Sequence, residues 1–236
     1  GAMIGAVYAT LYNRLGMPSF VSTLSGLLAI LGLQLYILGP TGSINLPFAS
    51  ALVGFGQLWI LPAWLSYLLG LLPGAVMVWV GLSVMRQRTA AGLSAQPLGR
   101  LVLKAAALTV GLEGAIYYLH LGRGVPVMFG LFVLLAVILN YGLTRTQWGR
   151  SMFAVGGNRE AARRSGINVR RIYLSAFMLC STLAALGGIL SAARLASSSQ
   201  QAGTGDVNLN AIAAAVIGGT SLFGGRGSAW SAVLGI

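Results

Sequence analysis

Long apolar runs alternate with short polar segments along most of the chain. Because a helix needs about 20 apolar residues to cross the hydrocarbon core of a bilayer, each such run predicts a transmembrane helix. We expect five complete spans, at residues 20–38, 61–85, 101–120, 125–144 and 172–193. Residues 1–12 and the apolar end near residue 236 resemble parts of further spans. We therefore expect an all-α, polytopic bundle within one transmembrane domain (1–236), as a fragment truncated at both ends.

The composition supports a membrane protein. Hydrophobic residues make up 56% of the chain and charged residues only 8%, whereas about a quarter of the residues in a soluble domain are charged. So few charges cannot cover the surface of a water-soluble fold of this size.

The charges are strongly biased towards cations. The net charge is +12, from 15 Lys and Arg against three acids, Glu113, Glu160 and Asp206. Seven arginines fall within residues 145–171 and most of the others flank apolar runs. This is the pattern of cytoplasmic membrane loops rather than of a nucleic-acid-binding surface, so no nucleic-acid partner is expected.

The positions of these cations predict an orientation. Residues 145–171 and the segment 85–104, which holds Arg86, Arg88, Arg100 and Lys104, are expected in the cytoplasm. The uncharged loop 40–57 and the short turn 121–124 are then expected outside.

The cytoplasmic loop 145–171 contains the signals of a short helix. Asn158 is a good N-cap, Glu160 falls in the first turn, Arg163 and Arg164 fall in the last, and Gly166 can end the helix in a left-handed conformation. A solvated linker is the alternative, but caps at both ends favour a structured docking element. Because so short a helix is marginal in water, we expect a partner surface to hold it.

The segment 207–227 predicts a second unusual element. Its apolar part has about ten residues, which is too short to cross, so a re-entrant or broken helix is expected. Non-helical backbone at membrane depth is tolerated only where it is buried by protein or lines a cavity. This makes the segment a candidate translocation pathway, with an ordinary tight turn as the alternative. The candidate residues are Gly218, Gly219, Thr220, Ser221, Gly224 and Gly225.

The same segment is not an ATP site. Gly219 and Gly224 have the spacing of a phosphate-binding loop, but Gly225 and Arg226 stand where Lys and Ser or Thr are required. Any energy source must therefore lie on another chain or in an ion gradient.

Glu113 is the only acid within a predicted span, and it shares a helix face with Tyr117 and His120. An intramembrane acid is a possible polar site of function, and it would suit an ion-coupled secondary transporter. The alternative is a polar group satisfied inside the bundle. A membrane-embedded enzyme would need paired carboxylates or His clusters, which one His and scattered acids cannot supply.

Three stretches together resemble the ribose- and xylose-type permeases of bacterial ATP-binding-cassette (ABC) sugar importers. They are GMPSFVSTLSG at 16–26, GGNREAARRSGIN at 156–168, and AGTG at 202–205 followed by AIAAAVIGGTSLFGGRG at 211–227. The stretch LGPTGSINL at 38–46 is closest to the xylose-type branch.

This resemblance implies a vitamin B12-importer-like (type II) permease fold in the bacterial inner membrane. It also implies a second permease copy, cytoplasmic ABC ATPase subunits that hydrolyse the ATP, and a periplasmic sugar-binding protein. No catalytic residue, metal or cofactor is expected on this chain. The residues that match the family's ATPase-coupling element are Gly156, Gly157, Asn158, Arg159, Glu160, Ala161, Ala162, Arg163, Arg164, Gly166 and Ile167.

Overall fold

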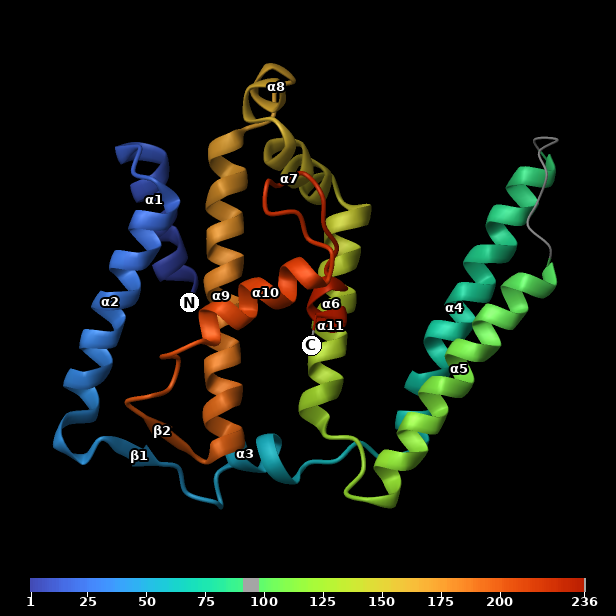
Figure 1. Ribbon diagram of the computed structural model, residues 1–236, viewed down its shortest axis with the longest axis horizontal. Coiled ribbons are helices and arrows are strands. Elements are labelled where there is room, and N and C mark those ends of the chain that lie inside the picture. Colours follow the sequence, from blue (N-terminus) through green and yellow to red (C-terminus); the bar gives the residue numbers. More distant parts are fainter. Residues whose placement is uncertain (91–97, 236) are drawn as a thin grey trace. The chain divides into compact units, whose positions relative to one another are not determined.

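The computed structural model describes residues 1–90 and 98–235, which are mostly helical (Figure 1). Residues 91–97, in the segment 85–104 that is predicted to be cytoplasmic, lie outside the described residues, and so does the side chain of Arg88. The chain forms two compact units, Gly1–Gln57 with Leu131–Ile236, and Leu58–Gly130.

Five helices are long and apolar enough to cross a membrane in the described part of the chain. They are α2 (Ser19–Leu38), α4 (Ala63–Ala90), α5 (Leu98–Leu121), α6 (Val127–Arg145) and α9 (Val169–Leu195). Each coincides with one of the predicted spans, which confirms the expected polytopic helical architecture. Many of their apolar side chains are exposed, so lipid or other protein must cover them.

The first unit is built around α9. The shorter helix α1 (Ala2–Leu15) packs along it, and Gly5 permits this close approach because a side chain there would meet the backbone of Phe177. The remaining helical elements of this unit are η1 (Gly39–Thr41), α3 (Ala51–Val53), α7 (Gln147–Gly157), α8 (Arg159–Arg164), α10 (Val207–Ile217) and α11 (Ser231–Leu234). A short π-helical stretch, η2 (Gly54–Leu58), follows α3.

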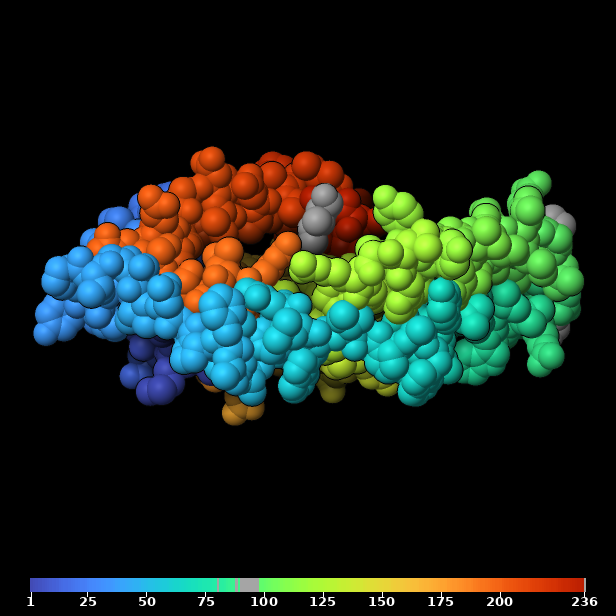
Figure 2. Space-filling view, turned by 90° about the horizontal axis from the view of Figure 1, so that it is seen from below, coloured from blue at the N-terminus to red at the C-terminus, as the bar shows by residue number. Residues whose placement is uncertain are grey.

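Two short strands join segments that are far apart in the sequence. The strand β1 (Ser43–Asn45) pairs antiparallel with β2 (Ser197–Ser199), and Ser43 lies opposite Ser199. Figure 2 shows the light-blue residues around β1 beside the orange residues around β2. The loop 40–57, which is predicted to lie outside the membrane, contains β1, and the pairing therefore predicts the same side for the loop that contains β2.

The second unit consists mainly of α4 and α5, which lie side by side (Figure 1). Glu113 of α5 faces Gly70 of α4, since a Cβ atom added to Gly70 would lie 2.8 Å from Glu113 Oε1. The ring of His120 stacks on Tyr67 with 5.6 Å between the ring centres. Neither Glu113 Oε1 nor His120 Nε2 has a hydrogen-bond partner among the described residues.

Candidate functional site

The short helix α8 has the ends that its sequence predicts. The Asn158 Oδ1 atom accepts a hydrogen bond from the Ala161 backbone N–H at 2.9 Å, which satisfies one of the free donors at the start of the helix. Beyond the helix, Gly166 takes a φ of +81°, a left-handed conformation that glycine adopts without strain. Between these two caps the chain is helical over Arg159–Arg164, as predicted.

The partner surface that α8 needs lies within its own chain. Ala162 is only 4% exposed and packs with Val155 of α7 and Val169 of α9. Ile167, Ile172 and Tyr173 pack against this small cluster. Burial of these apolar groups holds the helix in a fixed position, so a second protein is not required for α8 to form.

Arg159 connects α8 to two other helices, a connection that no sequence motif indicated. Its guanidinium carbon lies 5.8 Å from the ring centre of Tyr12 in α1 and 5.7 Å from that of Tyr173 in α9. The two rings are 4.7 Å apart. Nearby, Asn13 Nδ2 donates a hydrogen bond to the Arg170 carbonyl oxygen at 3.2 Å. No local pattern marks Tyr12 or Asn13 as part of this site, because both come from a distant helix.

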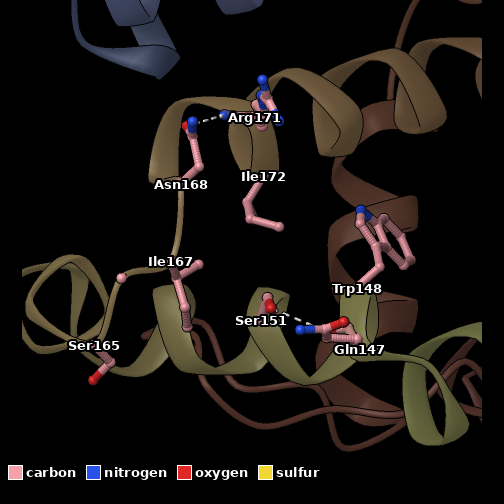
Figure 3. Close-up of a pocket in the computed structure, with 9 residues that line it drawn as sticks. Gln147, Trp148, Ser151, Ser165, Ile167, Asn168, Arg171 and Ile172 are labelled. Atoms are coloured by element: carbon pink, nitrogen blue, oxygen red, sulfur yellow. Dashed lines mark hydrogen bonds between the residues drawn. The ribbon is translucent and has the colours of Figure 1, made fainter.

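An open pocket of about 390 Å³ lies beside α8 (Figure 3). Its walls come from the start of α7, the α8–α9 connection and the start of α9. Trp148 and Ile172 supply apolar surface, and Arg171 supplies a cation. The Trp148 indole N–H donates to Ser175 Oγ at 2.8 Å, which fixes the orientation of the ring. The remaining residues that line the pocket are Gln147, Ser151, Ser165, Gly166, Ile167 and Asn168.

The exposed side of α8 carries mixed charge within a strongly basic segment. Glu160 Oε2 forms an ion pair with Arg163 at 3.2 Å, and both side chains are more than half exposed. Glu160 is the only acid in residues 145–171, against seven arginines. An exposed helix on a rigid base, next to a pocket and surrounded by charged side chains, is suited to dock on a charged surface of another protein.

The predicted pathway residues occupy two places. The helix α10 ends at Ile217, and Gly218 then packs against the backbone of Ser231 in α11. Thr220 Oγ1 donates a hydrogen bond to Ser231 Oγ at 2.9 Å. Gly224 and Gly225 instead lie against the backbone of Gly156 and Gly157 at the end of α7. The two predicted groups, the coupling residues and the pathway residues, therefore meet, and sequence spacing alone gave no sign of this.

Comparison with known proteins gives consistent similarities. The family profile described as "Branched-chain amino acid transport system / permease component" matches residues 1–235. The chain is similar to the xylose transport system permease protein XylH of Escherichia coli (strain K12), with 39% identity over 236 residues, 100% of this chain and 59% of the relative. XylH of Haemophilus influenzae is 36% identical over 225 residues, 93% of this chain and 57% of that protein.

A further similarity covers only part of the chain. The ribose import permease protein RbsC of Escherichia coli (strain K12) is 45% identical over 112 residues, which is 48% of this chain and 35% of RbsC. No solved structure matches the chain. The chain spans less than two thirds of the length of the xylose permeases that it matches.

Proposed function

The chain belongs to the branched-chain amino acid transport system permease component family, and from this premise we propose that it forms part of the permease subunit of an ABC importer for a sugar. The proposed substrate is a pentose such as xylose, because the relatives that match it over nearly its full length are xylose transport permeases. The chain is a membrane protein, and the proposed location is the bacterial inner membrane.

The observation that carries this proposal is the seating of α8. Its polar face is exposed while Ala162 anchors it to α7 and α9. A force applied to this helix is therefore passed to the long apolar helix α9 instead of being dissipated in a flexible loop. We assign residues 156–167 to contact with a cytoplasmic ATPase subunit, which hydrolyses the ATP.

The rest of the assembly follows from the same proposal. ATP-driven closure of two ATPase subunits pushes on α8 in each of two permease copies, and the helices rock between inward and outward access. A periplasmic sugar-binding protein delivers the sugar to the outer side, where β1 and β2 lie. Residues Gly218, Gly219, Thr220, Ser221, Gly224 and Gly225 belong to the segment that borders the translocation pathway.

Charge reversal at Glu160 tests the docking role. The full-length permease is expressed with its ATPase subunit, and co-purification and xylose uptake are measured. Glu160→Lys is expected to abolish both while leaving the chain inserted, because it replaces the only carboxylate of the proposed docking helix with a cation and so reverses the charge offered to the ATPase at that position. Glu160→Gln is the matched control for stability. It removes the ion pair with Arg163, but this exposed pair is worth only about 0–1 kcal/mol, so the stability should change little. Normal co-purification and uptake by Glu160→Lys would show that α8 is not the docking element.

Substrate competition distinguishes a sugar importer from an importer of branched-chain amino acids, the substrates that the family description names. Uptake of radiolabelled xylose is measured with an excess of unlabelled xylose, ribose or leucine. Competition by the pentoses but not by leucine supports a sugar importer, whereas uptake of radiolabelled leucine without uptake of radiolabelled xylose overturns the assignment. Inhibition by vanadate, which blocks ABC ATPases, is also expected.

A further inference from the structure

Four glycines bring two backbones into direct contact. Gly156 and Gly157 end α7, and Gly224 and Gly225 belong to the loop that runs from α10 back alongside α7 (Figure 1). A Cβ atom added to Gly156 would lie 2.8 Å from Gly225 N, and one added to Gly224 would lie 2.6 Å from Gly156 O. Both distances are too short for any side chain, so the contact exists only with glycine. We call these four residues the glycine junction.

The junction lies directly beside the start of α8. Gly157 precedes Asn158, the N-cap of that helix, and the Asn158 backbone N–H donates to the Ala154 carbonyl at 3.0 Å. No flexible residue therefore separates the junction from α8. Any displacement of α8 along its axis must move the junction as well.

The other end of the loop is attached to α10. The backbone N–H groups of Gly219 and Thr220 donate to the carbonyls of Val216 and Ala215 at 2.9 and 3.0 Å. The turn itself is closed by a hydrogen bond from Ser221 N to Arg226 O at 3.0 Å. Ser228 Oγ donates to Asn140 Oδ1 of α6 at 3.4 Å. The loop is thus braced at both ends and along its length.

We propose that the glycine junction is a mechanical link through which movement of α8 displaces the end of α10. The inference rests on the proposed function, because it needs α8 to be moved by an ATPase. A contact between backbones has no side chain that could absorb a displacement by rotation. The backbone contact therefore transmits small movements between α8 and the segment 218–227, whereas a contact between side chains would absorb them.

Alanine at Gly156 tests the link, and alanine at Gly142 in α6 is its control. Both glycines are helical and alanine is the better helix former, but only the Gly156 Cβ clashes; a Cβ added to Gly142 would meet no neighbouring atom within 4 Å. In proteoliposomes that hold the full-length permease, its ATPase and its binding protein, Gly156→Ala is expected to transport about tenfold less xylose per ATP hydrolysed. Gly142→Ala is expected to match the wild type, and equal coupling in the two variants would overturn the proposal.

Hydrogen exchange in the wild-type complex provides a test that needs no variant. Trapping the ATPase with ATP and vanadate is expected to change amide exchange in residues 159–164 and also in residues 214–225. A change in the first segment without one in the second would overturn the link while leaving the docking role intact. No change in residues 159–164 would overturn the proposed function, and the link with it.

Discussion

The Arg159 guanidinium carbon lies 5.7 Å from the centre of the Tyr173 ring, and the Tyr12 ring lies beside both groups. A cation held near the electron-rich faces of two rings is attracted to both. Arg159 is the first residue of α8, whereas Tyr12 and Tyr173 come from α1 and α9. One side chain thus ties the candidate docking helix to both of the helices on which this unit is built.

Removing this cation should loosen α8. Arg159→Ala is expected to destabilise the docked position of the helix by about 0.5–1 kcal/mol for each of the two rings. Faster amide hydrogen exchange in residues 160–164 of the detergent-solubilised protein is the measurement. Arg164→Ala is the control, because it removes a cation from the same helix but no ring or ion-pair interaction among the described residues. Similar exchange in the two variants would count against the attraction to the rings as the cause.

The N-cap offers an independent prediction. Asn158→Ala leaves the Ala161 N–H without its 2.9 Å acceptor and should cost about 1 kcal/mol of helix stability. If the ATPase binds only the ordered helix, its affinity falls in proportion to the ordered fraction of α8, by at most about fivefold.

Titration of the ATPase subunit against the purified permease measures this weakening of affinity. Asn158→Asp keeps an oxygen acceptor at the same place and should restore the affinity. Weaker binding by both variants would instead indicate that the Asn158 amide contacts the ATPase directly.

The elements that could be predicted are those whose signals are local. The five spans follow from the length of each apolar run, and α8 follows from Asn158 and Gly166 at its ends. The ends of the spans follow less closely from the apolar pattern. The helix α4 continues to Ala90, beyond the apolar run that ends at residue 85, because a helix needs no apolar residues to continue its backbone hydrogen bonds.

The contacts that build the site could not be predicted in the same way. Tyr12 and Arg159 are 147 positions apart, and neither has a neighbour in sequence that indicates the other. The glycines at 156–157 and 224–225 were assigned to two separate roles, coupling and pathway, because only the folded backbone brings them together. Tertiary packing determines which distant residues come into contact, and a single sequence does not reveal those contacts.

Glu113 is expected to be dispensable for energy coupling. Its buried Oε1 atom lies beside Gly70, and neither this atom nor His120 Nε2 has a hydrogen-bond partner, so the described residues show no relay that connects the two groups. Glu113→Gln, which has nearly the same shape, should retain most xylose uptake. Uptake should also persist with a protonophore present and stop with vanadate. An uptake that is abolished by both Glu113→Gln and the protonophore would favour an ion-coupled secondary transporter.

The pairing of β1 with β2 predicts a disulfide that reports on both structure and orientation. Hydrogen bonds from Leu46 N to Ala196 O at 2.8 Å and from Gln200 N to Gly42 O at 3.1 Å flank the strands. Since hydrogen-bonded and non-hydrogen-bonded pairs alternate, Ser43 and Ser199 form a non-hydrogen-bonded pair, in which side chains are closest. Such a pair is within reach of a disulfide.

The test uses Ser43→Cys with Ser199→Cys in a Cys180→Ala background, which removes the only thiol within residues 1–236. If both loops face the periplasm, the bond forms in living cells, because that compartment is oxidising and the cytoplasm is not. The control pair, Ser43→Cys with Ser197→Cys, is diagonal at about 7–8 Å and should remain largely reduced. Thiol labelling before and after reduction measures the difference.

If the pair stays reduced in cells but is oxidised after lysis, the strand pairing is correct and the predicted orientation is reversed. That orientation would place α8 in the periplasm, where it cannot dock on a cytoplasmic ATPase. A pair that is oxidised in neither condition would contradict the strand pairing itself.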